Sequence, residues 1–285
     1  MKNQARLTLH CPDRPGLVAE LSLLLHAKGY NITALDQYAT EPQEGHFFLR
    51  IEFQGPEKGP GRSALYQELE GKAAEFQAEY WNLRFVEDRR KMAILASRTE
   101  HAPLELLWRW KNGELDADLK MVVSNHTVLQ PLVESMGVPF VHVPVTPDTK
   151  PESERQILEH LGEDMDLMVL ARYMQILSDE FVSQFPNRMI NIHHSFLPAF
   201  VGANPYGRAF ERGVKIIGAT AHYVTKDLDE GPIIEQGVSR VTHRDSTSEL
   251  KRRGKIIERE VLARAVEWHL EDRILVNGNK TVVFS

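Results

Sequence analysis

The chain has 285 residues, 42% of them hydrophobic and 26% charged, which is typical of a globular protein and exceeds the usual size of one domain. Its formal net charge of −6, without a basic tract, argues against a nucleic-acid partner. One cysteine, Cys11, and no signal-type or membrane-spanning apolar segment lead us to expect a cytoplasmic protein with no membrane partner.

Residues 1 to 88 are expected to form a small domain. Leu7, Leu9 and Cys11 alternate with polar residues and predict a strand. Leucines at helical spacing from Leu17 predict a helix that ends at Gly29. Strands are expected over 30–40, 47–53 and 81–86, and a second helix over 65–76. This βαββαβ order is that of the ferredoxin-like fold.

The turn between the first strand and the first helix, Pro12-Asp13-Arg14-Pro15-Gly16-Leu17, resembles that of ACT domains, which commonly bind amino acids. Gly16 frees the backbone where a helix N-terminus offers unpaired N–H groups, which suits a carboxylate. The resemblance implies an amino-acid effector bound by Asp13, Gly16 and Leu17, and assembly into a homo-oligomer. Alternatively, Gly16 only starts the helix and the module only dimerises.

Residues 89 to 285 are expected to form a second domain with an α/β fold. Apolar strand patterns alternate with helical patterns as far as residue 194, which predicts a doubly wound, mostly parallel, Rossmann-like sheet. Two later strands, near 216–224 and 233–241, are close enough in sequence to pair as an antiparallel extension. Ser246 to Glu249 form a capping box that opens a long helix, and a hairpin follows near 276–279.

Polar side chains follow the apolar strand that begins at Met189. Asn191 and His193 lie where that strand ends, and the carboxyl ends of parallel strands are where ligands bind in open α/β sheets. A later strand carries His222, and Asp229 follows it. An amide, an imidazole and a carboxylate together can hydrolyse or transfer an acyl group, because they can orient water, shuttle a proton and stabilise an oxyanion.

Two other interpretations of these residues stay open. Asp229 could serve only the tight turn before Gly231, because Asp and Gly favour such turns. His193, His222 and Asp229 could instead hold a metal ion as two imidazoles and one carboxylate. Their spacing matches no compact metal motif, so we assign no metal ligands.

The motifs Asn191-Ile192-His193, Ser195-Phe196-Leu197-Pro198 and Leu228 to Ile234 resemble the formyltransferase/hydrolase family that uses 10-formyltetrahydrofolate. With the ACT-like module in front, residues 5 to 285 are similar to the formyltetrahydrofolate deformylases, and the doubled His193-His194 resembles their pattern. The resemblance implies hydrolysis of the folate substrate to tetrahydrofolate and formate, for one-carbon metabolism and purine biosynthesis, without a cofactor. It also implies Asn191, His193 and Asp229 as the catalytic residues.

The same resemblance implies a set of substrate-binding residues: Leu170, Arg172, Tyr173, Met174, Gln175, Ile176, Gly202 and His222. Two residues depart from the family pattern, since Gln175 replaces a frequent arginine and Ala102 stands where many deformylases have cysteine.

Two functional alternatives remain at this stage. The first is a formyltransferase using the same folate donor. The loop Ser97 to Pro103 lacks the glycines of a phosphate cradle, which argues against a nucleotide acceptor, and the acidic charge argues against transfer RNA. The second is a regulatory protein that binds folate and an amino acid without catalysing a reaction.

Overall fold

A computed structural model describes residues 3–41, 45–56, 61–198 and 205–285. The chain forms two compact units, which are described separately. The N-terminal unit holds the residues up to Arg89 together with 271–277 and 282–285, and the larger unit holds 90–270 and 278–281. The sequence predicts one unbroken second domain from residue 89 onward, whereas the structure groups most of the C-terminal hairpin with the N-terminal unit.

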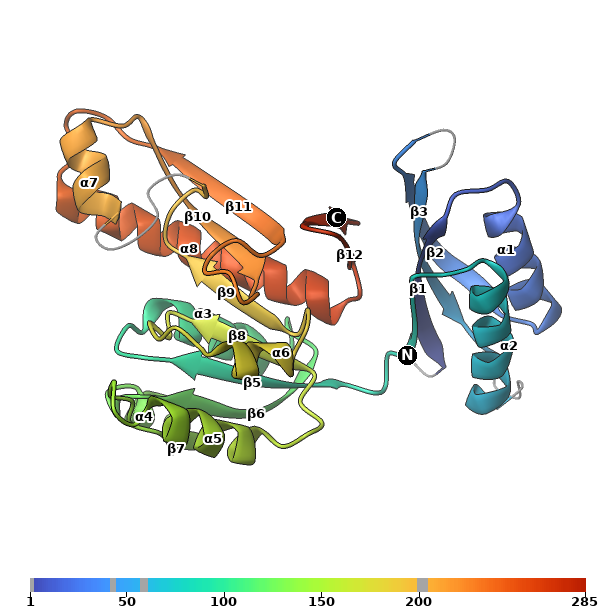
Figure 1. Cartoon of the computed structure of the whole chain (residues 1–285), viewed down its shortest axis with the longest axis horizontal. Helices are drawn as coiled ribbons and strands as arrows, with labels where there is room; N and C mark the ends of the chain where they lie inside the picture. The colour runs from blue at the N-terminus through green and yellow to red at the C-terminus, as the bar shows by residue number, and fades with distance from the viewer. Residues whose placement is uncertain (1–2, 42–44, 57–60, 199–204) are drawn as a thin grey trace. The chain divides into compact units, whose positions relative to one another are not determined.

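The N-terminal unit begins with elements in the order βαββαβ, which confirms the predicted fold. Its strands pair in the order β2-β3-β1-β4, and all neighbours are antiparallel. Both helices cover one face of this sheet (Figure 1). The elements are β1 (Gln4–Pro12), α1 (Leu17–Ala27), β2 (Asn31–Ala39), β3 (His46–Gln54), α2 (Arg62–Glu75) and β4 (Tyr80–Phe85).

The core of the N-terminal unit lies between the sheet and its two helices. Leu7, Leu9 and Cys11, at alternate positions of β1, share one cluster of buried side chains with Leu21 of α1 and Leu65 of α2. The period of two therefore places these side chains on the helix-covered face, as their alternation predicts. The intervening residues of β1 point to the other face of the sheet.

The larger unit is built on a seven-stranded sheet in the order β11-β10-β9-β8-β5-β6-β7. The five neighbouring strands β9, β8, β5, β6 and β7 are parallel, whereas β10 is antiparallel to both β9 and β11. This confirms the predicted, mostly parallel sheet. The strands are β5 (Arg90–Ala96), β6 (Ala117–Ser124), β7 (Phe140–His142), β8 (Leu167–Ala171), β9 (Met189–His193), β10 (Ile216–Tyr223) and β11 (Ile233–Arg240).

The central strand β5 is covered on both faces. Ala93 and Leu95 belong to a buried cluster that includes Ile157 of a helix, while Met92 and Ile94, which point to the opposite face, are also completely buried. Burial on both faces explains the continuous apolar run of this strand. On one side of the sheet, α8 packs against β9, β10, β11 and α3.

The helices of the larger unit differ from the predicted ones mainly where they are short. They are α3 (His101–Lys111), α4 (Gln130–Ser135), α5 (Lys150–Leu161), α6 (Asp179–Ser183), α7 (Pro205–Arg212) and α8 (Thr247–Leu270). Helices α6 and α7 were not predicted from the sequence, because they are too short to show a helical repeat of apolar residues. The capping box before α8 forms as predicted: the Ser246 N–H donates to Glu249 Oε2 at 2.6 Å, and the Glu249 N–H donates to Ser246 Oγ at 3.3 Å.

An irregularity marks the pairing of β10 with β11. Ala221 pairs with Glu235, but His222 pairs with Ile233, so Ile234 is an extra residue on β11. The connection between these strands includes Gly231, where an added Cβ would lie 1.9 Å from the Tyr223 carbonyl oxygen. The backbones approach so closely that this position requires glycine.

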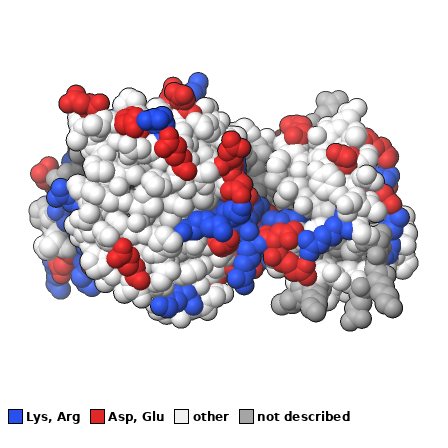
Figure 2. Space-filling model, turned by 90° about the horizontal axis from the view of Figure 1, so that it is seen from below, with Lys and Arg blue, Asp and Glu red and all other residues white. Residues whose placement is uncertain are grey.

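The chain ends with β12 (Ile274–Asn277) and β13 (Lys280–Val283), which form the predicted hairpin. Within the described residues, no helix has both the length and the apolar character needed to cross a membrane. On the face drawn in Figure 2, acidic and basic side chains of the described residues are interspersed.

Candidate active site

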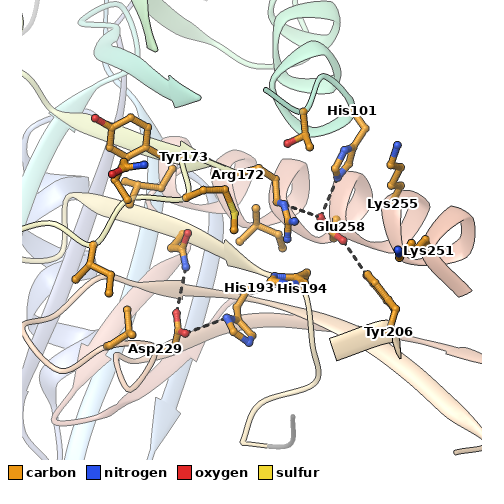
Figure 3. A pocket seen from close by; sticks show the side chains of 18 residues that line it. His101, Arg172, Tyr173, His193, His194, Tyr206, Asp229, Lys251, Lys255 and Glu258 are labelled. Carbon is orange, nitrogen blue, oxygen red and sulfur yellow. Dashed lines mark hydrogen bonds and ion pairs between the residues drawn. The ribbon is translucent and has the colours of Figure 1, made fainter. Parts of the chain in front are cut away.

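A cavity lies at the carboxyl ends of the parallel strands in the larger unit. Within the sheet, β5 has β6 as its neighbour on one edge and β8 as its neighbour on the other. The strand order therefore reverses between β5 and β8. Such switch points are where open α/β sheets bind ligands. The cavity has a volume of about 590 Å³ (Figure 3). Its lining comprises Thr99, His101, Leu170, Arg172, Tyr173, Met174, Gln175, Ile176, Asn191, Ile192, His193, His194, Tyr206, Leu228, Asp229, Lys251, Lys255 and Glu258.

The structure brings the amide, imidazole and carboxylate together in this cavity. Asn191 and His193 come from β9, and Asp229 comes from the connection after β10. His193 Nδ1 lies 3.0 Å from Asp229 Oδ2, and Asn191 Nδ2 lies 3.4 Å from Asp229 Oδ1. Residues 38 positions apart in the chain thus form one polar group (Figure 3).

The two ring nitrogens of His193 have different surroundings. Nδ1 faces the Asp229 carboxylate, so we assign the ring proton to it. Nε2 is buried and has no hydrogen-bond partner among the described residues. The neutral ring therefore keeps an unengaged lone pair at Nε2, and His193 lines the cavity.

Asp229 is charged at neutral pH. Burial raises the pKa of its carboxyl group, but the hydrogen bonds and charge interactions with His193 and His222 outweigh burial and hold this pKa well below its ordinary range. The backbone of Asp229 has φ 58, in the left-handed region that Asp and Asn tolerate better than most residues. The residue thus meets the needs of the turn and also directs a carboxylate at His193.

His222 supports Asn191 from the neighbouring strand. Its Nδ1 lies 2.9 Å from the Tyr223 carbonyl oxygen, which can only accept, so Nδ1 carries a proton. Its Nε2 lies 3.2 Å from Asn191 Nδ2 and 3.5 Å from Asp229 Oδ1. We adopt the shorter contact, in which the Asn191 amide donates to Nε2. The lowered pKa of Asp229 then rests chiefly on His193. His222 lines a smaller adjoining cavity rather than the main one.

The segment after β8 forms an apolar wall with a strained backbone. The backbone at Arg172 and Met174 has φ 63 and 60, values that residues other than glycine rarely adopt. The Met174 and Ile176 side chains line the cavity and are 61% and 62% exposed. Arg172 Nε and Nη1 are buried without a hydrogen-bond partner among the described residues. The wall therefore offers apolar contact area and unused N–H donors to a ligand.

A buried carboxylate, Glu258 of α8, closes one side of the cavity and was missed by the sequence analysis. Its side chain accepts a hydrogen bond from the Tyr206 hydroxyl at 2.8 Å, lies 2.8 Å from His101 Nε2 and lies 3.6 Å from Arg172 Nε (Figure 3). Burial raises the pKa of Glu258, but these partners lower it below its ordinary value. An acidic residue on the apolar stripe of a helix, between Ile257 and Val261, was the signal available in the sequence.

Replacing Glu258 with glutamine is expected to lower the free energy of unfolding by about 2 kcal/mol, because charged hydrogen bonds are lost and Arg172 loses its buried counter-charge. Urea denaturation measures this change. Glu260→Gln, at an exposed position of the same helix, is the matched control and is expected to unfold like the wild type.

The same substitution has an expected pH dependence. Because the folded-state pKa of Glu258 is lowered, its stabilising contribution is present above the unfolded-state value of about 4.3 and is lost as the pH falls through the folded-state value. The difference between wild type and Glu258→Gln should therefore be largest near neutral pH and should narrow below about pH 4. A difference that stayed constant as the pH fell well below 4 would contradict a charged Glu258.

His194, next to His193 in the chain, is uncharged at neutral pH. Burial and the nearby positive charge of Arg172 lower the pKa of His194 to about 4. Its neighbour His193 differs in its surroundings, since it has the Asp229 carboxylate within hydrogen-bond distance. The sequence identifies His194 only within a motif, and it does not indicate that Thr99, His101, Tyr206, Lys251 and Lys255 line this cavity.

Most of the substrate-binding residues expected from the sequence lie together. Leu170 and the segment from Arg172 to Ile176 line the main cavity, and His222 lines the adjoining one. Gly202 lies outside the described residues. Ala102 is buried within α3 and does not line either cavity.

The expected effector residues belong to the N-terminal unit. Gly16 has φ 96 and precedes α1, and no side chain caps the helix there. The Asp13 N–H donates to the Gly45 carbonyl oxygen at 2.8 Å. The Leu17 side chain is part of the buried core, so only its backbone N–H is suited to contact a ligand. The N-terminus of α1 therefore presents backbone N–H groups at Gly16, with no side-chain cap among the described residues.

Comparisons with known proteins agree with this architecture. The ACT domain family matches residues 5–60, and the formyl transferase family matches residues 90–266. A formyltetrahydrofolate deformylase from Bacillus subtilis is 50% identical over 285 residues, covering 100% of this chain and 95% of that protein.

Solved structures of deformylases and of a transformylase are also similar to this chain. A formyltetrahydrofolate deformylase from Pseudomonas syringae has a TM-score of 0.95 at 43% identity, covering 99% of this chain and 94% of that one. A glycinamide ribonucleotide transformylase from Symbiobacterium toebii has a TM-score of 0.65 at 28% identity and covers 73% of this chain and 99% of its own. The chain therefore belongs to the formyltetrahydrofolate deformylase family, with an ACT domain in front of a formyl transferase domain.

Proposed function

We propose that this protein hydrolyses 10-formyltetrahydrofolate to tetrahydrofolate and formate, with Asn191, His193 and Asp229 as its catalytic residues. The observation that carries the proposal is that His193 Nε2 has no hydrogen-bond partner among the described residues, in a cavity where Asp229 orients the ring and the Asn191 amide lies beside it. An oriented imidazole with a free lone pair is the arrangement that general-base catalysis needs. The family relationship supports the reaction, and the geometry supports the roles proposed for these residues.

The reaction begins when water transfers a proton to His193 Nε2 as its oxygen bonds to the formyl carbon. The carbonyl oxygen becomes an oxyanion, which accepts a hydrogen bond from the Asn191 amide. The protonated His193 then donates its proton to N10 as the carbon–nitrogen bond breaks. The products are tetrahydrofolate and formic acid, which ionises to formate, so one water molecule is consumed and atoms balance.

His193 rather than Asp229 is the proposed proton acceptor. A carboxylate whose pKa is held well below its ordinary range is a weak base, and Asp229 is such a carboxylate. Its oxygens also face His193, Asn191 and His222. Asp229 is therefore assigned to orient the imidazole and to stabilise the imidazolium that forms.

The segment after β8 is proposed to hold the folate. The exposed side chains of Met174, Ile176 and Leu228 offer apolar area for a flat ring system, and exposed apolar groups at a cavity commonly mark binding sites. The unused Arg172 N–H groups can donate to carbonyl or carboxylate oxygens of the ligand. Gln175, also in the lining, can contribute an amide in place of an arginine's charge.

Water is the proposed acceptor because the side of the cavity near α8 is occupied by protein groups. Tyr206 and His101 both bond to the Glu258 carboxylate there. At Gly254 an added Cβ would lie 2.0 Å from the Tyr206 hydroxyl oxygen, so this tyrosine packs directly on the helix backbone. Together with the glycine-free loop after β5, this leaves less room for a phosphorylated amine acceptor.

Incubation of the purified chain with 10-formyltetrahydrofolate is expected to release one formate per tetrahydrofolate formed. Formate is measured by a coupled assay and tetrahydrofolate by absorbance. Adding glycinamide ribonucleotide should neither speed the loss of substrate nor yield a formylated nucleotide. Transfer to that acceptor would favour the formyltransferase alternative, and binding of the folate without turnover would favour a regulatory protein.

Three further expectations from the family resemblance remain proposals. The ACT domain is proposed to bind an amino-acid effector near Gly16, and the chain is proposed to form a homo-oligomer in the cytoplasm. Isothermal titration calorimetry with individual amino acids tests for the effector. Sedimentation of the purified protein tests for the homo-oligomer.

A further inference from the structure

A second cluster of ligand-type side chains lies in the N-terminal unit, separate from the catalytic residues. His10 Nε2 is 3.0 Å from His46 Nδ1 and 3.9 Å from Glu79 Oε2, and His46 Nδ1 is 3.1 Å from Glu79 Oε1. Among the described residues, this is the one group of three or more His, Cys, Asp or Glu side chains whose ligand atoms all lie within 4.8 Å of one another. His193, His222 and Asp229, which the sequence left open as metal ligands, do not meet that spacing.

The spacing of the three side chains matches a transition-metal site. Zinc binds imidazole nitrogen and carboxylate oxygen at about 2.0 to 2.2 Å in a tetrahedron, so its ligand atoms stand about 3.3 Å apart. The three distances in the cluster lie on either side of that value. The side chains of His46 and Glu79 are 42% and 51% exposed, so small rotations of both would bring one Glu79 oxygen to a similar distance from each imidazole nitrogen.

The sheet holds the ligands from three neighbouring strands. His10 belongs to β1, His46 begins β3 and Glu79 immediately precedes β4, whose first residue Tyr80 pairs with His10. The Glu79 N–H donates to the His10 carbonyl oxygen at 2.9 Å, which fixes the backbone of one ligand to that of another. The His10 ring stacks on Phe48 with centroids 4.3 Å apart, so its orientation is also fixed.

From this geometry we propose that His10, His46 and Glu79 bind one divalent transition-metal ion of the zinc class, with a water molecule as the fourth ligand. Two imidazoles and one carboxylate are a ligand set that zinc accepts, and the exposed side of the cluster leaves the fourth position open to solvent. The His10 side chain is 5% exposed, so the ion would rest against the sheet rather than hang from mobile surface groups. The ion would join β1, β3 and β4 and therefore stabilise the N-terminal unit.

The competing explanation is a hydrogen-bonded chain of the same groups. Without any metal, His46 Nδ1–H can donate to both His10 Nε2 and Glu79 Oε1, which it contacts. Such a chain predicts no ion at stoichiometric concentration. A metal site instead predicts tight binding of one ion, which is lost when any one of the three ligands is removed.

The test is titration of the untagged, full-length protein with zinc chloride, followed by elemental analysis after dialysis, and with cobalt chloride, whose visible spectrum reports the geometry of its ligands. One ion per chain is expected. Mutating a residue that only hydrogen-bonds to a metal ligand typically lowers metal affinity by about 10-fold to 100-fold. Removing a ligand itself, as in His46→Ala or Glu79→Gln, should therefore weaken binding by about 100-fold or more.

Two controls separate this site from others. His26→Ala, at an exposed position of α1 in the same unit, should bind like the wild type, and so should Asp229→Asn in the catalytic cavity. Zinc should raise the melting temperature of the wild type but not that of His46→Ala, because an ion that binds only the folded state stabilises it. The proposal is overturned if the wild type binds no ion at a one-to-one ratio, if all variants bind equally, or if only Asp229→Asn loses binding.

Discussion

Replacing Asp229 with asparagine is expected to lower kcat by about 10² to 10⁴, the range that general acid–base catalysis contributes to a rate. Asparagine keeps the size of the side chain and its tolerance of the left-handed backbone, so the turn should survive. The variant loses the charge that orients the His193 ring and stabilises its protonated form. Steady-state formate release measures the effect, and thermal melts confirm that the variant is folded.

The pH profile adds an independent measurement of the same substitution. The negative charge of Asp229 favours the imidazolium of His193, so removing it should move the acid limb of the rate profile to lower pH. The carboxylate itself titrates far below that limb, since its pKa is strongly lowered. Asp227→Asn, in the same connection but exposed, is the matched control and should keep both rate and profile. If Asp229→Asn behaves like that control, the carboxylate serves only the turn.

Replacing Asn191 with alanine is expected to lower kcat by about 10² to 10³, the scale measured for removal of one oxyanion donor. The amide has two N–H groups, so it can hold His222 Nε2 and still donate to the oxyanion. Because the oxyanion exists only in the transition state and the intermediate, KM should change little. A folded variant with wild-type turnover would remove Asn191 from the mechanism, and a raised KM alone would make it a substrate-binding residue.

The sequence could predict the fold and the catalytic residues for different reasons. Strand and helix periods gave the order of elements in both units, because alternate apolar side chains of β1 and β3 share one buried cluster with the helices and both faces of β5 are buried. Asn191, His193 and Asp229 were found because strand ends of a parallel sheet meet at one edge and because their motifs resemble a known family. The close contact of His193 with Asp229 required the structure, since 36 positions separate them in the printed sequence.

The features that the sequence could not predict depend on register or on distant partners. His10 and His46 meet because β1 and β3 pair with Pro12 opposite His46. A shift of this register by one residue would turn the His46 side chain to the other face. Glu258 is acceptable in an apolar stripe only because Tyr206 and His101 reach it from other elements. Helices α6 and α7 were missed because a few residues do not reveal a period.

The extra residue in β11 bears on which changes of chain length this enzyme can tolerate. A loop on the surface can gain or lose residues with little effect, because loop closure depends only weakly on length. Ile234 is different, since the bulge sets the phase of β11 against β10 just after the connection that carries Asp229. Deleting it would either turn the following side chains of β11 to the opposite face or pull the connection toward the sheet. Insertions and deletions should therefore be rare at this point, even though the ladder would look more regular without the extra residue.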